Sequence, residues 1–168
     1  MSITQAPHTL RSHYARPPAI DLFAPQPGVA RNADLYILRQ ILHEWSDKYA
    51  AKILTQLRVA AGPQSKLLVI ESVLLYACDQ PPEELAVKGT QALVPPAPLL
   101  PNLGGANARL YYGDVLMLAI YNGQERTVLH FAELFRSTGW ELKERGDLEA
   151  FCFVNQEHER ILERSYKA

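Results

Sequence analysis

The segment "LHEWSDK", residues 42–48, places side chains that can exchange protons directly after an apolar run. His43 carries an imidazole with an ordinary pKa of about 6.5, so it can accept a proton at neutral pH. Two carboxylates, Glu44 and Asp47, and the indole of Trp45 lie close to it in the chain. Such a polar group of residues at the end of a buried strand indicates a functional site.

Two further carboxylates are candidates for the same site. Glu71 follows the apolar part of "KLLVIESVLL", residues 66–75, where an unpaired buried carboxylate would be costly. It is therefore either a site residue or a salt-bridged residue of the scaffold. Glu125, in "NGQERT", is either a site residue or a first-turn carboxylate favoured by the positive end of a helix.

The elements around His43 read as strand, helix and strand. Residues 34–42 form an apolar strand, and Ser46 can cap a helix that Gly62 and Pro63 end. Residues 66–75 have the composition of a parallel strand covered on both faces. The helix has one face spaced for burial: Ala50, Ile53, Leu54, Leu57 and Ala60.

The C-terminal half adds helices and a hairpin. Residues 108–123 predict a largely buried helix, and Thr127 can cap a second helix that ends near Gly139. Residues 140–146 and 149–156 alternate as an antiparallel hairpin at the sheet edge. The sequence therefore predicts an α/β domain of about four strands with flanking helices.

All but one of the 12 prolines lie in two clusters, at 7–27 and 81–101, where they exclude helix interiors and central strands. Residues 79–108 are thus a long irregular segment, either a lid or an arm over a neighbour. The expected division is an irregular segment at 1–33, an α/β domain at 34–157 and a tail at 158–168.

Composition excludes several classes of function. The net charge of −1 gives no basic surface for nucleic acid and no polybasic segment for lipid. Cys78 and Cys152 are too few and too far apart for a metal site or a disulfide framework, which favours a reducing cytoplasm. No apolar run is long enough to cross a membrane.

Several segments resemble the S-adenosylmethionine (SAM)-dependent O-methyltransferases of the plant caffeate and flavonoid type and their fungal relatives. The similar pieces follow the family's order: "DLF" (21–23), "ADLYILRQILHEWSD" (33–47), "KLLVIESVL" (66–74) and "DVLMLAIYNGQERTVLHFAELFRSTGW" (114–140). The resemblance implies the C-terminal part of a Rossmann-like methyltransferase domain.

The resemblance implies three catalytic residues. His43 would be the general base that takes a proton from an acceptor hydroxyl, flanked by Glu71 and Glu125. The chemistry suits an imidazole, because a phenol with a pKa of about 10 is mostly protonated at neutral pH. A carboxylate on one ring nitrogen would fix the tautomer and stabilise the imidazolium.

The resemblance also implies binding residues for SAM and for the acceptor. Asp21 and Leu22 would lie near the adenine of SAM, and Arg39 and Trp45 would also face the cofactor. Met117 would line the acceptor pocket. Glu44, which stands where family members usually carry Asp, is also placed on the acceptor side. No metal is implied.

The resemblance further implies that an N-terminal dimerisation domain and a glycine-rich cofactor turn are missing from this chain. Strand 34–40 would then lack its usual neighbour and leave apolar groups uncovered. We therefore expect a homo-oligomer or association with a longer methyltransferase chain.

Two classes of function follow. The first is methyl transfer from SAM to a hydroxyl of a small aromatic or polyketide-like metabolite. The alternative is a catalytically incomplete binding or scaffold subunit, or a non-methylating relative of pericyclase or isomerase type.

Overall fold

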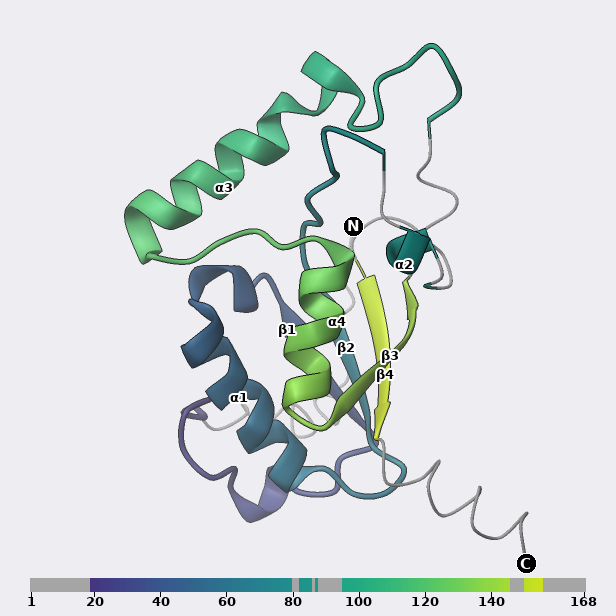
Figure 1. Ribbon diagram of the computed structural model, residues 1–168. Coiled ribbons are helices and arrows are strands. Elements are labelled where there is room, and N and C mark those ends of the chain that lie inside the picture. Colours follow the sequence, from purple (N-terminus) through teal and green to yellow (C-terminus); the bar gives the residue numbers. More distant parts are fainter. Residues whose placement is uncertain (1–18, 80–81, 86, 88–94, 146–149, 156–168) are drawn as a thin grey trace, which may run out of the picture.

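The computed structural model describes residues 19–79, 82–85, 87, 95–145 and 150–155 (Figure 1). The predictions for residues 1–18, for the tail at 158–168 and for much of the proline-rich segment at 81–94 lie outside these residues. Within them, no helix is both long enough and apolar enough to span a bilayer.

A four-stranded sheet has the order β1-β2-β4-β3. β1 (Leu35–Arg39) and β2 (Lys66–Ile70) are parallel, with Leu35 opposite Lys66 and Arg39 opposite Ile70. β4 (Ala150–Asn155) is antiparallel to both β2 and β3 (Trp140–Arg145). The expected α/β fold and its C-terminal hairpin are confirmed.

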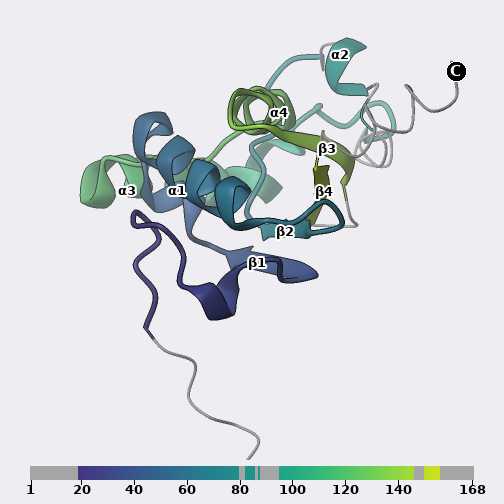
Figure 2. The same ribbon diagram turned by 90° about the horizontal axis from the view of Figure 1, so that it is seen from below.

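Two helices, α1 (Asp47–Ala60) and α4 (Val128–Ser137), cover one face of this sheet (Figure 2). The predicted face of α1 is buried. At the start of α4, the Thr127 side chain accepts a hydrogen bond from the His130 N–H at 3.3 Å. Ser46 occupies the N-cap position of α1, but its side chain makes no capping hydrogen bond. The indole N–H of fully buried Trp140 donates to the Leu54 carbonyl at 3.1 Å, which joins β3 to α1.

The opposite face of the sheet is open at β1. Leu35 and Ile37 are 49% and 58% exposed, whereas Tyr36 and Leu38 face the core. On β2, Leu68 is only half-buried, so the prediction that this strand is covered on both faces is wrong for the described part of the chain. β1 pairs with β2 alone among the described residues, which agrees with the expected uncovered edge.

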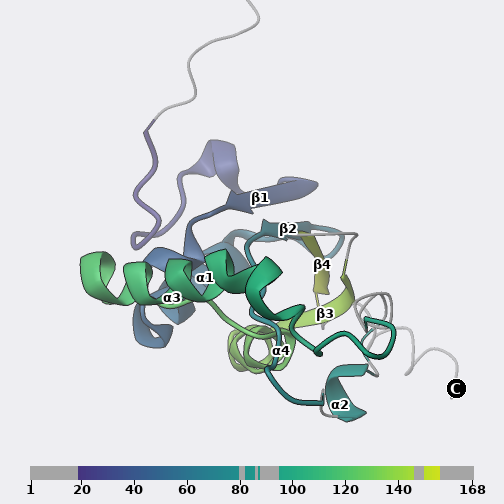
Figure 3. The same cartoon turned by 90° about the horizontal axis from the view of Figure 1, so that it is seen from above.

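The third long helix, α3 (Ala108–Tyr121), differs most from the expectation. It lies apart from the sheet, beyond the N-terminal end of α1 (Figures 1 and 3). None of its residues is buried, so the prediction of a largely buried helix is wrong. Its apolar residues surround the helix, and the described residues do not supply enough neighbours to cover them: Tyr112, Val115, Leu116, Leu118, Ile120 and Tyr121.

The segment that leads to α3 holds a short helix, α2 (Pro82–Leu85), and a 3-10 turn, Gly104–Asn107. Its Gly104-Gly105 pair precedes a helix and does not follow a strand, unlike a nucleotide-binding glycine turn. Whether the segment acts as a lid or as an arm over a neighbour stays a prediction.

Candidate active site

The parallel pairing of β1 and β2 brings two of the candidate residues to one edge of the sheet. His43 lies in a 3-10 turn, Leu42–Glu44, just after β1, and Glu71 follows the last residue of β2. In open α/β sheets, ligands bind outside the carboxyl ends of the strands. The topology thus places both side chains where such a site is expected.

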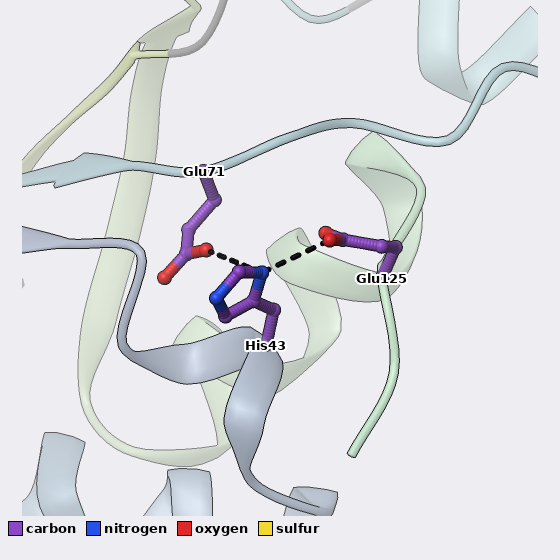
Figure 4. A group of neighbouring side chains, drawn as sticks. All are labelled: His43, Glu71 and Glu125. Carbon is purple, nitrogen blue, oxygen red and sulfur yellow. Dashed lines mark hydrogen bonds and ion pairs between the residues drawn. The ribbon is translucent and has the colours of Figure 1, made fainter. Parts of the chain in front are cut away.

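Glu71 is fully buried and holds the turn that carries His43. Its Oε1 accepts hydrogen bonds from the backbone N–H groups of Ile41 and Leu42, at 2.8 and 2.7 Å. Its Oε2 lies 3.8 Å from Nδ1 of His43 (Figure 4). Glu71 therefore both fixes the turn and places negative charge beside the imidazole.

Glu125 reaches the imidazole from a distant part of the chain. Its Oε1 lies 2.9 Å from His43 Nδ1, and the Gln124 N–H donates to the His43 carbonyl at 2.9 Å (Figure 4). Asp114 of α3 accepts from the Glu125 N–H at 2.8 Å. Because α4 begins only at Val128 and has no acid in its first turn, the geometry favours the site role of Glu125 over the helix-dipole role.

The hydrogen bond to Glu125 decides which ring nitrogen of His43 can act as a base. An ionised carboxylate only accepts, so Nδ1 must carry the proton in the neutral imidazole. Nε2 then keeps its lone pair, and none of the described residues is hydrogen-bonded to it. The side chain is 13% exposed. One nitrogen is thus held by carboxylates while the other is free to accept a proton.

Hydrogen bonding and burial shift the pKa of two of these groups. The hydrogen bond to Glu125 raises the pKa of His43 above its ordinary 6.5; burial opposes this, and the charges of Glu71, Glu125 and Glu44 add to it. Burial raises the pKa of Glu71, against the lowering effect of the hydrogen bonds from Leu42 and Ile41. The site favours a protonated imidazole beside carboxylates, as a base should once it has taken its proton.

We expect thermal stability to fall as pH rises from about 6 to about 8. A raised pKa for His43 in the folded state contributes stability that is fully present below the unfolded value of 6.5. This contribution is lost as pH rises through the folded-state pKa. Melting temperatures across this range should fall in the wild type and fall less in Glu125→Gln, which removes the main cause of the shift. Parallel curves for the two proteins would contradict the assignment.

The same three residues could also surround a cation. Their ligand atoms lie within 4.8 Å of one another. Oε2 of Glu71 and Oε2 of Glu125 are buried without a hydrogen-bond partner among the described residues. However, a metal on Nδ1 would have to displace the proton that His43 shares with Glu125. We therefore interpret the group as a proton-handling site.

The residues expected to face SAM lie near the same edge of the sheet. The Trp45 ring contacts Phe23 edge-on at 4.8 Å between centroids, and the Asp21 carboxylate accepts from the Phe23 N–H at 2.9 Å. Leu22 packs partly buried against the core, and Arg39 is exposed at the end of β1. An exposed carboxylate beside partly open aromatic rings fits a cofactor that carries both hydroxyls and an adenine.

The acceptor-side residues are less well defined. Glu44 is half-buried in the His43 turn, and Met117 is half-buried on α3. A pocket of about 330 Å³ beside Glu125 is lined by residues that include Asp114 and His130. Neither Met117 nor Glu44 lines this pocket, so the structure does not join them into one acceptor cavity.

Sequence reasoning missed residues that position the site. Gly123 lies so close to the His43 turn that a Cβ atom there would overlap the His43 carbonyl oxygen. Arg126 is a fully buried cation bound to Asp47, and Asp47 also meets Nε2 of His130 at 2.9 Å. Both Gly123 and Arg126 lie within two residues of Glu125 in "NGQERT". This closeness to a candidate site residue is the sequence feature that could have identified them.

An edge of a parallel strand pair that holds a His between two carboxylates defines the class of α/β domain that binds a ligand outside the carboxyl ends of its strands. The sequence profile of the O-methyltransferase domain matches residues 20–141. The chain belongs to this O-methyltransferase family, and the resemblance inferred from its motifs is confirmed.

Fungal relatives support this assignment. The chain is 45% identical over 138 residues to an O-methyltransferase of Armillaria gallica, covering 82% of this chain and 29% of the relative. It is 42% identical over 121 residues to the 4-O-methyltransferase 1 of Phanerochaete chrysosporium, covering 71% of this chain and 25% of that protein. The chain thus spans less than a third of the length of these relatives.

A solved structure supports the fold. The mitomycin 7-O-methyltransferase MmcR has a TM-score of 0.56 at 23% identity, over 80% of this chain and 32% of that one. At this identity the likeness concerns the fold alone.

Proposed function

We propose that this chain supplies the proton-accepting part of a SAM-dependent O-methyltransferase that acts on a hydroxyl of a small aromatic or polyketide-like metabolite. The observation that carries the proposal is the 2.9 Å contact between His43 Nδ1 and Glu125, which leaves Nε2 free. Family membership supports the reaction class. The two distant cysteines favour a cytoplasmic location.

In this mechanism, Nε2 of His43 removes the proton from the acceptor hydroxyl. Glu125, and behind it Glu71, stabilise the resulting imidazolium. SAM, when bound, would supply the electrophilic methyl group for the deprotonated acceptor oxygen, with S-adenosylhomocysteine as the leaving group.

We assign Asp21, Leu22, Arg39 and Trp45 to the cofactor side, and Met117 and Glu44 to the acceptor side. Asp21 and Trp45 are joined through Phe23, which supports a shared surface. Because the curated relatives are more than three times longer than the matched region, further contacts to SAM would come from methyltransferase sequence outside it.

Calorimetric titration with SAM and with S-adenosylhomocysteine tests whether the chain binds the cofactor. Methyl transfer from labelled SAM to a panel of phenols tests the reaction. The proposal expects saturable binding of both compounds and labelled product, with the chain alone or with a longer methyltransferase chain added. Absence of labelled product under both conditions would contradict the enzyme proposal.

The uncovered apolar surface favours a second candidate function, that of a subunit. Leu35 and Ile37 are exposed on β1, and α3 exposes apolar residues around its circumference. Helices that are hydrophobic all round are normally buried. We therefore propose that the exposed apolar residues of β1 and α3 contact a second copy of the chain or a longer methyltransferase chain.

We expect the wild type to elute as a concentration-dependent oligomer in light-scattering chromatography, alone or with a longer relative. The double change Leu35→Lys and Ile37→Lys should shift it to the monomer, because charge replaces apolar contact area. Val59→Lys is the matched control, since Val59 is 70% exposed on α1, which covers the sheet face opposite to Leu35 and Ile37. A monomeric wild type that captures no longer chain would contradict the association.

A further inference from the structure

Arg126 is a buried charge that the proposed chemistry does not use. Its side chain is fully buried, yet a guanidinium stays protonated at any physiological pH. Burying such a charge is costly unless it is paired and hydrogen-bonded. The identity of its partners therefore shows what the residue holds together.

The guanidinium binds backbone carbonyls on both sides of His43. Nη1 donates to the Leu42 carbonyl at 2.8 Å, and Nη2 donates to the Trp45 carbonyl at 2.7 Å. These two residues bracket the pair His43-Glu44 in the chain. The guanidinium thus fixes the 3-10 turn at both ends.

The charge partner of Arg126 is Asp47 in the first turn of α1. Asp47 Oδ1 accepts from Arg126 Nε at 3.0 Å and lies 2.9 Å from Nη2. The same Oδ1 accepts from Gln124 Nε2 at 2.8 Å. Asp47 is 51% exposed, so it can be changed without opening the core.

The backbone of Arg126 is tied to the third partner of the site. Its carbonyl accepts from the Leu74 N–H at 3.0 Å, and it forms a bridge with Val73. Both residues follow Glu71 closely in the chain, and Glu125 is the immediate neighbour of Arg126. One residue therefore touches the segments that carry His43, Glu71 and Glu125.

We propose that Arg126, anchored by Asp47, is a positioning residue that sets the His43 imidazole against the Glu125 carboxylate for the proposed proton transfer. The inference rests on the proposed function for its purpose, but the geometry can be tested without it. The side-chain hydrogen bonds of Arg126 go to Leu42, Gln124, Trp45 and Asp47 and not to the His43 ring, so Arg126 acts on the ring through the backbone of the turn.

The test is an NMR pH titration of the His43 ring protons in the full chain. Arg126→Gln should lower the proton affinity of His43, because the hydrogen bond to Glu125 is the main cause of its raised pKa. The direction of the change in the His43 pKa distinguishes two explanations. Mere loss of a nearby positive charge would raise the proton affinity, whereas loss of positioning lowers it. Arg126→Lys should recover part of the effect.

Asp47→Asn gives a second variant if Arg126→Gln does not fold. It should lower the His43 proton affinity, and the shift should persist at high salt, which screens the direct effect of removing the half-exposed Asp47 charge. Arg136→Gln is the matched control, since Arg136 is exposed on α4 and the chemical change is the same. An unchanged or raised His43 pKa in folded Asp47→Asn or Arg126→Gln would overturn the proposal. If these pKa shifts are found but no methyl transfer is detected, the positioning role of Arg126 stands and only the proposed enzymatic function is contradicted.

Discussion

Replacement of His43 by glutamine is expected to lower the rate of methyl transfer by about 10²- to 10⁴-fold, the usual contribution of a general base. Glutamine keeps a polar group near Glu125 but cannot accept the proton of the acceptor hydroxyl. The measurement is the initial rate with labelled SAM and a phenolic acceptor, in whichever assembly is active. Thermal unfolding of the variant should show that it is folded.

The pH dependence supplies the control for this variant. A phenol with a pKa of about 10 ionises without help at high pH, so the deficit of His43→Gln should shrink as pH rises towards 10. A deficit that is constant with pH, or a variant that keeps most of the wild-type rate, would show that His43 is not the base.

The second large effect is expected from Gly123→Ala. A Cβ atom at Gly123 would overlap the His43 carbonyl oxygen and lie 2.7 Å from the Glu44 carbonyl carbon. Both are backbone atoms and cannot rotate away, so the turn or residues 123–125 must move. We expect a loss of about 1–3 kcal/mol in the free energy of unfolding. Since a displacement of about 1 Å can cost 10²-fold in rate, methyl transfer should fall by about that factor.

Gly113→Ala is the matched control for this substitution. Gly113 lies inside α3, and nothing is found within 4 Å of an added Cβ atom. Alanine there should stabilise the helix by about 0.5–1 kcal/mol. Urea denaturation measures both variants. Equal stability changes at the two glycines would mean that the close approach at Gly123 does not constrain the site.

Local sequence patterns were sufficient to predict α1 and α4, the two helices that pack on the sheet. The spacing of Ala50, Ile53, Leu54 and Leu57 predicted the buried face of α1, and all four are buried. The Thr127 cap was also correct. In these elements the side-chain period and the packing surface belong to the same short segment, so the sequence alone carries the necessary information.

Burial that depends on distant partners could not be predicted in the same way. The apolar composition of α3 indicated a buried helix, but composition does not say which surface covers it. The open face of β1 has the same cause. The family resemblance gave the better prediction for the edge of β1, where no described strand pairs on the side away from β2.

The sequence predicted the candidate site residues themselves but not the residues that hold the His43 turn in place. The His43 cluster followed from the family motifs, and the structure brings Glu71 and Glu125 to one ring nitrogen. The roles of Arg126 and Gly123 depend on backbone carbonyls of the His43 turn, more than 70 residues away in the chain. Their proximity to Glu125 in "NGQERT" draws attention to both residues, but no local pattern indicates which backbone atoms they contact.

The most direct test of the central claim is ¹⁵N NMR of the His43 ring in the wild type and in Glu125→Gln. We expect a neutral imidazole that is protonated at Nδ1 and unprotonated at Nε2, a pKa above 6.5 for the wild-type ring, and a lower pKa in the variant. A neutral form protonated at Nε2, or a pKa that Glu125→Gln does not change, would contradict it.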